Sequence, residues 1–559
     1  MAVFWQAHGY LDILALSLPT IYPALLFCKS CTSLWHNSRA YNSKFSRTTI
    51  TNGRDGDSDI AVLATERKSS PASSPIESLA PELLLDIFKE VSSGPYIVNR
   101  LGSPPWVLTF VNKKWRAVAQ SCSSLWSTFI VDASPNKSFD PRLLELAISL
   151  TGTNPLNVYW QSQGKIRDVS GPNSRFFAVF QTFLQASARW RTVSFEFHSS
   201  FLNSLISLSD HLESLEEMCI FLSDNHVRDP LSDPEYYEID GTNLSVMLCS
   251  ALRLRRFTQW GGPPLLPIFE HLAEYSLQYD VACGLHVLAF LRHILMVSHG
   301  LEELTIRRNA FLPNESLPQG NVHPVVTHTA LRRLDTDDPV IIMASNLPRL
   351  EELTIKFNNI AFSMPGIIPA IGRSHTTLTS ISISAIHLFQ FYTDEFIAAI
   401  HSCPNVCYIK LKDQPDVIVF DFDAGPQLLP DVEMDGVVAV LRSFVPSRDG
   451  AVPCPRLKML NLEVHSYLCV ESNLIAIRKS QLAGATLSMI QGRRTLSSTV
   501  KQVEVAMIYR DGWPVDLIET HESLDSVLTD YGPVTRADLQ TWKSSGLSLE
   551  FRWHREYTG

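Results

Sequence analysis

Two aspartates in the C-terminal half of the chain have a spacing that could support phosphate chemistry. Asp421 and Asp423 follow the apolar run 417–420, so a buried β-strand there would end with two carboxylates. One carboxylate could act as a nucleophile and the other as an acid beside a magnesium ion, which prefers oxygen ligands.

The motif is similar to the strand-end Asp-x-Asp of haloacid-dehalogenase-type phosphotransferases. However, Gly425 stands where those enzymes usually carry threonine or valine, and the surrounding sequence lacks their alternating strand–helix order. Too little chain follows for the whole fold. We therefore interpret this segment as a loop between repeats and keep an Asp421/Asp423 phosphohydrolase only as an alternative.

Other patterns that could hold a metal or a nucleophile are incomplete. Cys28 and Cys31 have the spacing of a zinc pair, but no second pair follows at zinc-finger distance. The acidic residues in 55–66 are spaced like calcium ligands, but Ile60 replaces the glycine of the sharp turn. The sequence contains no glycine-rich phosphate loop and no His-Glu-x-x-His motif. We predict no enzyme activity, no metal site and no cofactor.

Composition indicates an ordinary soluble protein of more than one folding unit. The chain has 559 residues, 45% hydrophobic and 19% charged, which is too long for one compact core. The net charge of −10 disfavours nucleic acid as a partner. Ten cysteines at irregular spacing do not form a disulfide scaffold, so we expect reduced thiols and a cytoplasmic or nuclear location, or both.

The apolar run 11–27 raises the question of a targeting segment. Asp12, Pro19 and Pro23 interrupt it, and no lysine or arginine precedes it. A secretory signal normally begins with basic residues. We do not expect a signal peptide or a membrane anchor here, and we interpret 1–74 as a largely flexible lead-in.

A first amphipathic helix is predicted after this lead-in. Pro81 suits the first helical position because its missing N–H has no intrahelical partner there. Leu79 and Leu84 have the spacing of a hydrophobic staple. The apolar residues then recur at i, i+3, i+4 and i+7, namely Leu84, Ile87, Phe88 and Val91.

A second helix is predicted to begin at Ser103-Pro104, and a short apolar element covers 125–131. The apolar side of that helix consists of Val107, Phe110, Val111, Trp115 and Val118. Three short elements in about fifty residues carry more large apolar side chains than such a small unit can bury. We therefore expect a partner protein to cover part of this surface.

The segments 79–88, 111–116 and 125–126, in this order, resemble the F-box, most closely in the proteins of mushroom-forming (basidiomycete) fungi. Ala80 and Asn112 depart from the usual proline and cysteine. The resemblance implies a small all-helical F-box domain over 75–132 that docks on a Skp-type adaptor and, through it, on a cullin. The residues predicted to bind the adaptor are Leu79, Pro81, Leu84, Ile87, Phe88, Val111, Trp115, Leu125 and Trp126.

The rest of the chain contains an internal repeat. The segments 301–309 and 350–358 fit the pattern LxxLxLxxN, and 350, 378 and 406 are separated by 28 residues. Further copies begin at 190, 215, 254, 272, 331, 378, 406, 457 and 500. We predict an α/β chain in which an irregular leucine-rich-repeat-like strand–helix solenoid covers 133–520, with a cap or tail over 521–559. Cys403 and Cys454 precede two such strands and are predicted to be buried thiols at repeat corners.

These observations together favour a non-catalytic receptor. The resemblance implies the substrate-recognition subunit of a Skp–cullin–F-box ubiquitin ligase, whose repeat region would bind a target protein of unknown identity. The alternative is a protein-interaction scaffold that takes no part in ubiquitin transfer.

Overall fold

The structure is a computed structural model. It describes residues 79–92, 94–133, 139–161, 175–197, 205, 211–222, 247–248, 250–261, 270–279, 292–308, 325–338, 341–342, 344–357, 367–386, 388, 393–414, 432–446, 452–466, 472–495, 500–511 and 536–557. The fold is mixed α/β with a long parallel β-sheet. The chain divides into two compact units, Met1–Asp132 with Ser138–Val158, and Ala133–Lys137 with Tyr159–Gly559.

The first unit combines short helices with two short strands. The helices are α4 (Pro81–Val91), α5 (Pro104–Val111), α6 (Lys113–Ser121), the 3-10 turn η3 (Ser123–Leu125) and α7 (Pro141–Leu150). β1 (Tyr96–Ile97) pairs in parallel with β2 (Thr128–Asp132). The prediction of an all-helical domain over 75–132 is therefore wrong. Phe129 and Val131 are buried whereas Thr128 and Ile130 are half-buried, a period of two that favours a strand.

Asn112 divides into two helices a segment that we expected to form one. Its backbone is extended, with φ of −160°, so α5 ends before it. Its side-chain oxygen then accepts a hydrogen bond from the backbone N–H of Trp115 at 2.8 Å. Asparagine is a favoured N-cap because it satisfies a donor that the first turn leaves free. Asn112 thus begins α6.

An aromatic cluster forms the core of the first unit. The ring of Trp126, which is fully buried, lies 4.8 Å from Trp106 and 5.7 Å from Tyr96 between centroids. The indole N–H of Trp126 donates to the carbonyl of Ala119 at 2.9 Å, and that of Trp106 donates to Val98 at 3.1 Å. Both buried donors are therefore satisfied, as a stable core requires.

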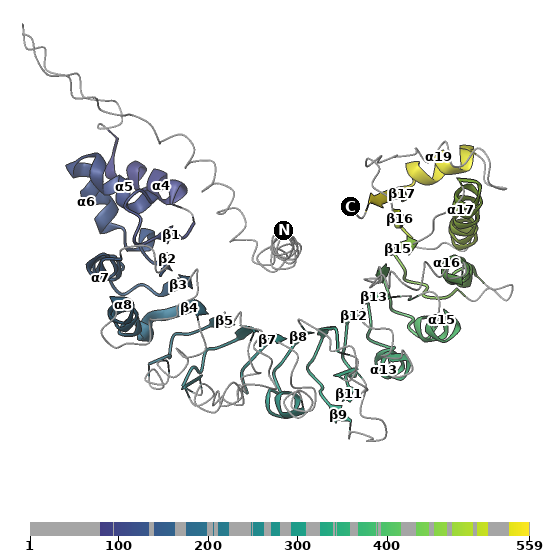
Figure 1. Cartoon of the computed structure of the whole chain (residues 1–559), viewed down its shortest axis with the longest axis horizontal. Helices are drawn as coiled ribbons and strands as arrows, with labels where there is room; N and C mark the ends of the chain where they lie inside the picture. Colours follow the sequence, from purple (N-terminus) through teal and green to yellow (C-terminus); the bar gives the residue numbers. More distant parts are fainter. Residues whose placement is uncertain are drawn as a thin grey trace, which may run out of the picture. The chain divides into compact units, whose positions relative to one another are not determined.

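The second unit is a ladder of parallel strands that follow one another in chain order (Figure 1). β3 (Leu156–Gln161) spans the boundary between the units. The strands of the ladder after it are β4 (Trp190–Phe197), β5 (Glu217–Leu222), β6 (Arg256–Trp260), β7 (Glu274–Tyr279), β8 (Glu303–Arg308), β10 (Arg333–Thr336), β12 (Glu352–Phe357), β13 (Ser380–Ile386), β14 (Tyr408–Gln414), β15 (Met459–Ser466), β16 (Gln502–Asp511) and β17 (Ser548–Tyr557). β9 (Val326–Thr327) and β11 (Ser345–Asn346) pair separately.

The register aligns apolar residues of the repeat into buried rows. One row, in which every side chain is at most 2% exposed, consists of Leu304, Leu334, Leu353, Ile381, Ile409, Leu460 and Val503. Because side chains alternate along a strand, the residues between such rows face the other side of the sheet. The predicted strands from 190 to 500 are thus confirmed as strands of a parallel sheet. β3 was not predicted, and β17 adds a strand within 521–559, where we expected only a cap or tail.

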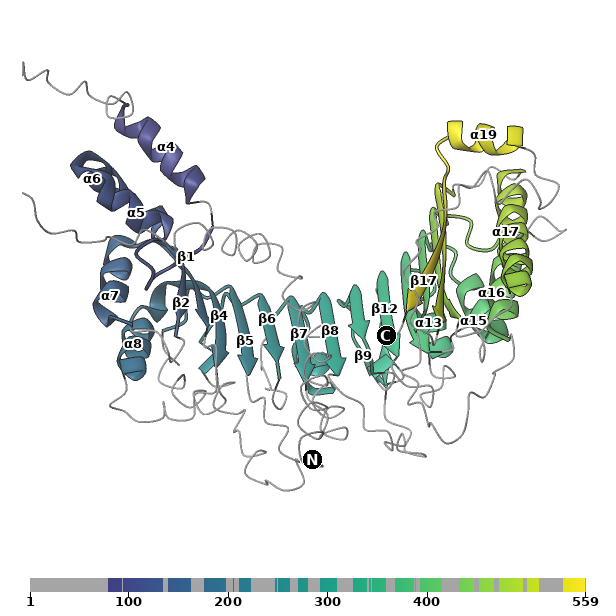
Figure 2. The same cartoon turned by 45° about the horizontal axis from the view of Figure 1, so that its top comes forward.

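Helices cover the apolar side of this ladder. In its C-terminal half, α13 (Ile367–Ser374), α15 (Thr393–His401), α16 (Val432–Ser443) and α17 (Ser472–Thr495) pack each beside the next along one face of the sheet (Figure 2). The helix predicted at 393–401 is confirmed. The remaining helical elements of the unit are α8 (Arg175–Leu184), the 3-10 turn η4 (Ser187–Arg189) and α19 (Arg536–Ser544).

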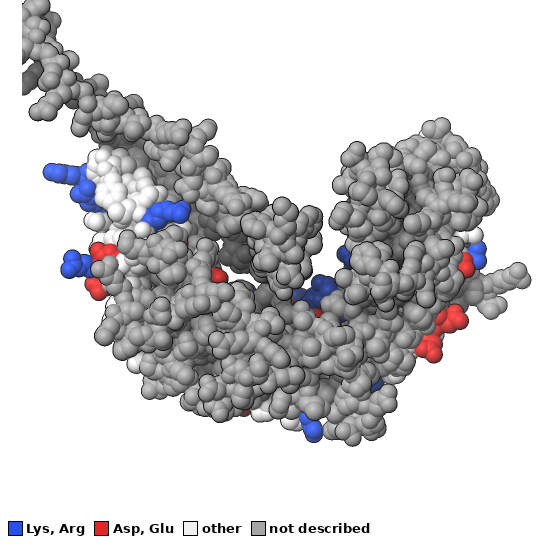
Figure 3. Space-filling model, viewed as in Figure 1, with Lys and Arg blue, Asp and Glu red and all other residues white. Residues whose placement is uncertain are grey.

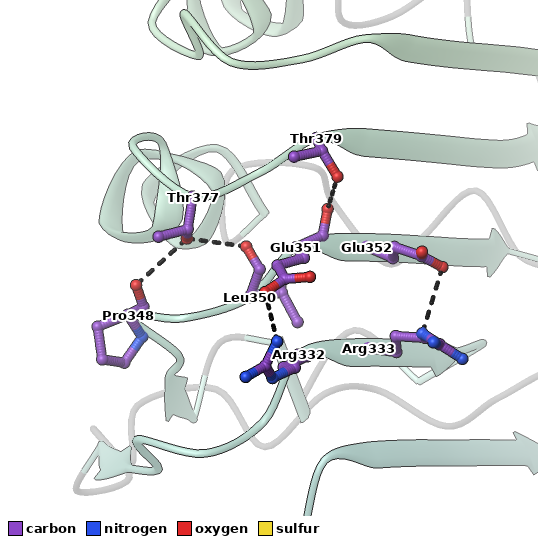
Figure 4. Close-up of polar contacts among 8 residues, drawn as sticks. All are labelled: Arg332, Arg333, Pro348, Leu350, Glu351, Glu352, Thr377 and Thr379. Atoms are coloured by element: carbon purple, nitrogen blue, oxygen red, sulfur yellow. Dashed lines mark hydrogen bonds and ion pairs between the residues drawn. The ribbon is translucent and has the colours of Figure 1, made fainter.

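Polar side chains connect neighbouring repeats where the strands begin. The hydroxyl of Thr377 donates to the carbonyls of Pro348 at 3.2 Å and Leu350 at 2.8 Å (Figure 4). In the same region Arg332 and Glu351 approach to 3.2 Å. The contacts of Thr377 satisfy backbone carbonyls at a repeat corner, and the ion pair joins the side chains of two neighbouring repeats.

Candidate functional site

The first unit exposes large apolar side chains on α4. Leu83, Ile87 and Val91 follow each other at four-residue intervals and are 54%, 41% and 58% exposed. Leu84 and Phe88 lie on the adjoining line of the same helix and are fully buried. The apolar stripe of α4 is therefore wider than the core beneath it, and one of its edges remains on the surface.

Helix α5 repeats this arrangement. Val107, Phe110 and Val111 are 43%, 60% and 51% exposed, while Trp106 and Leu108 are buried. α5 contacts α4, and the ammonium of Lys114 at the start of α6 donates to the carbonyl of Leu79 at 2.6 Å. We call the exposed set the apolar strip; its members are Leu83, Ile87, Val91, Val107, Phe110 and Val111. Uncharged surface flanked by lysine and arginine is visible on this unit in Figure 3.

The structure separates the predicted adaptor-binding residues into three groups. Ile87, Pro81 and Val111 are exposed. Leu79 and Trp115 are half-buried. Buried residues are Leu84, Phe88, Leu125 and Trp126.

The four buried residues correct the expectation that they lie on the accessible surface. The ring of Phe88 packs against Trp115 with centroids 5.0 Å apart, and Trp126 belongs to the aromatic core. Helical spacing alone marks both edges of the apolar stripe of α4 as equivalent. The core beneath the helix then covers only one of them.

Four members of the apolar strip were not among the predicted binding residues: Leu83, Val91, Val107 and Phe110. The i, i+4, i+8 line through Leu83, Ile87 and Val91 is visible in the sequence and could have identified the first two. Large exposed apolar patches on soluble proteins mark interaction sites. The geometry of the apolar strip therefore supports binding of another protein there.

The buried thiols of the second unit have surroundings that oppose reactivity. Burial raises the pKa of Cys403 to about 11 and that of Cys454 to about 12. A thiol with a raised pKa stays protonated and is a poor nucleophile and metal ligand. Both side chains are at most 1% exposed, which confirms their prediction as buried residues at repeat corners.

Several expectations fall on residues that the structure does not describe. These are Asp421 and Asp423, Cys28 and Cys31, and the run 11–27. Within the described residues, no group of three or more His, Cys, Asp or Glu side chains could hold a metal ion. Nor is any helix among them long and apolar enough to span a bilayer.

Comparison of the chain with known protein families gives no match, and comparison with curated proteins gives none either.

Proposed function

We propose that this chain is an F-box protein with leucine-rich-repeat-like C-terminal units, and that it acts as the substrate-recognition subunit of a Skp–cullin–F-box ubiquitin ligase. The observation that carries the proposal is the apolar strip on α4 and α5, in the segment whose sequence resembles the F-box. The parallel ladder, in which the repeats that begin at 350, 378 and 406 are spaced by 28 residues, supports the second half of the proposal.

In this proposal the protein performs no chemistry of its own. A Skp-type adaptor covers the apolar strip, and the strand face of the second unit holds the target near the ligase. Because the adaptor and the target are bound to the same chain, the lysines of the target are at high effective concentration near the ligase. This function belongs to the cytosol or nucleus.

The test uses the full-length chain with Val107→Glu and Phe110→Glu together. Each buried apolar side chain of this size contributes about 1.5–3 kcal/mol, so we expect affinity for a Skp-type adaptor to fall about a hundredfold or more. A matched control carries Leu146→Glu and Leu252→Glu, at apolar positions outside the strip that are 43% and 66% exposed. Co-precipitation measures binding, and circular dichroism verifies that both variants are folded.

Two results would distinguish the alternatives. Adaptor binding that survives the strip substitutions, or that the control removes equally, contradicts the docking surface. Adaptor binding without co-purified cullin and without turnover of bound targets favours the scaffold that takes no part in ubiquitin transfer.

A further inference from the structure

One row of side chains crosses the ladder on the face opposite the buried rows. The register aligns Phe221, Trp260, Gln278 and Arg307 on β5 to β8, and Lys356, Ser384, Lys412 and Glu463 on β12 to β15. Ile306 and Ile355 both align with Thr336, so Arg307 and Lys356 stand at the same level. Residues far apart in the sequence therefore form one continuous line.

The N-terminal end of this row is aromatic. The rings of Phe221 and Trp260 are stacked, with centroids 5.4 Å apart and planes at 30°. Both side chains are half-buried, so part of each ring faces outward. Partly exposed aromatic rings of this kind are common anchors in protein interfaces.

The C-terminal part of the row carries the cations Arg307, Lys356 and Lys412, with Asp337 level with the first two and Glu463 at its end. Lys410 lies two residues before Lys412 on β14, in the adjacent row of the same face. Arg307 pairs with Asp335, and Lys412 pairs with Glu463 at 2.6 Å. Among the residues that the structure describes, Lys356 and Lys410 form no ion pair. We call Arg307, Lys356, Lys410 and Lys412 the strand-face cluster.

Lys356 is surrounded by two cations and two carboxylates. Burial lowers its pKa, and the positive charges of Arg307 and Lys410 lower it further. Asp335 and Asp337 oppose this effect but do not outweigh it. An incoming negative group would relieve the repulsion between these cations.

The strand between the two lysine-bearing strands carries small hydroxyl side chains. On this face of β13 these are Ser380, Ser382 and Ser384, which align with β12 on one side and β14 on the other. Ser380 and Ser382 are half-buried and Ser384 is buried. A serine hydroxyl can donate to a carboxylate. The lysine-bearing strands β12 and β14 thus flank a strand whose side chains on this face are short and polar.

The charges around the strand-face cluster indicate which kind of negatively charged partner it can bind. Carboxylates lie nearby, with Asp335 on β10, Asp337 just after it, Glu463 on β15 and Glu504 on β16, and they disfavour a continuous phosphate backbone. Arg307, the side chain best shaped for a phosphate group, is already paired. The available cations are lysines, which act as point charges and suit single carboxylates.

We propose that this face binds an extended, Asp/Glu-rich protein segment that places an aromatic or aliphatic side chain on Phe221 and Trp260 and its carboxylates on Lys356 and Lys410. Strands of a sheet lie about 4.8 Å apart, so the six steps from β6 to β14 span about 29 Å. An extended chain covers that distance with about nine residues. The segment therefore carries its apolar anchor roughly six to nine residues from its acidic group.

This inference names the kind of segment that the proposed function would place on the strand face, but its test does not need the adaptor. The full-length protein is used to select from a random peptide library. We expect retained peptides to be enriched in Asp and Glu, with an apolar residue at the stated distance. Binding of a retained peptide, labelled with fluorescein, should weaken with rising salt and fall about tenfold or more in Lys356→Glu/Lys410→Glu.

The control variant is Lys458→Glu/Lys501→Glu, which makes the same charge change at exposed lysines just before β15 and β16. It should bind the peptide as the parent does. Peptides without acidic enrichment, or equal losses in both variants, would overturn the proposal. So would binding that requires phosphoserine in place of glutamate, or equal competition by a single-stranded oligonucleotide.

The two proposals fail independently. Lys356→Glu/Lys410→Glu should leave adaptor binding intact, whereas Val107→Glu/Phe110→Glu should leave peptide binding intact.

Discussion

Arg493 shows how a single buried charge is accommodated in this fold. Its guanidinium is fully buried on α17 and donates to the carbonyls of Phe444 at 3.2 Å and Cys454 at 3.3 Å. Its carbon Cζ also lies 5.7 Å from the centre of the Phe444 ring. Burial lowers its pKa. Cys454, one of the acceptors, has a positive backbone φ of 44°. One side chain on α17 thus connects the residues just after α16 with those just before β15.

His328 gives the second unit a dependence on pH. Its Nδ1 accepts from the backbone N–H of Leu331 at 3.1 Å, and its Nε2 lies 2.9 Å from the carbonyl of Ser298. Only the neutral ring with its proton on Nε2 makes both bonds. Burial, and to a smaller extent the nearby His299, lowers the pKa of His328 below its usual 6.5.

We therefore expect the midpoint of urea unfolding to fall as the pH drops from about 7.5 to about 5.5. A group with a lowered folded-state pKa stabilises the protein above its unfolded pKa, and this contribution is lost as the pH falls through the folded value. The variant His328→Asn should be less stable at neutral pH but less sensitive to acid. His375→Asn serves as the control. If the unfolding midpoint of His328→Asn fell with pH as steeply as that of the parent protein, the prediction would be wrong.

At the scale of the element, helix ends decide the layout of the first unit. Asn112 both ends the run of α5 and caps α6. The prediction of one continuous helix followed the apolar periodicity, which passes through 112 without a break. The cap was nevertheless visible in the sequence, because asparagine is rare inside helices and favoured before them.

The variant Asn112→Ala tests this cap. It removes the acceptor for the N–H of Trp115, and we expect the free energy of unfolding of the first unit to fall by about 1 kcal/mol. Asn112→Asp should retain most of the stability, because a carboxylate also accepts that hydrogen bond. Thermal denaturation compares the two. Equal losses in both variants would show that the side chain acts through something other than capping.

At the scale of the whole molecule, each repeat of the second unit pairs mainly with its neighbours in the ladder. In such an architecture, stability is nearly a sum of repeat and interface contributions, so damage should remain local. Ile383 is fully buried on β13, between Ile355 and Leu411 in register.

We expect Ile383→Ala to cost about 2–5 kcal/mol, because it leaves a cavity in a buried row. Hydrogen exchange measured by mass spectrometry should accelerate first in β12, β13 and β14, while β5 and β6 remain protected. Ser382→Ala, on the same strand but the opposite face, is the control. Uniform acceleration throughout the ladder would instead indicate a single cooperative unit.

The sequence by itself determined the positions of the repeat strands between 190 and 500 and the separation of a small N-terminal module from a repeat region. Those features follow from local rules: apolar residues at fixed spacing form a strand, and a serine or aspartate before a proline begins a helix. The strands that begin near 301, 350, 378 and 406 all lie where the LxxLxL pattern placed them.

Only the tertiary structure decided which apolar residues are buried and which remain on the surface. Leu84 and Ile87 look equivalent on the helical stripe of α4, but one is fully buried and the other 41% exposed. Trp115 and the other side chains packed beneath α4 come from later in the chain and reach only one edge of that stripe. Likewise, Trp260 and Lys412 join one row only through the register of the strands between them, which no local pattern records.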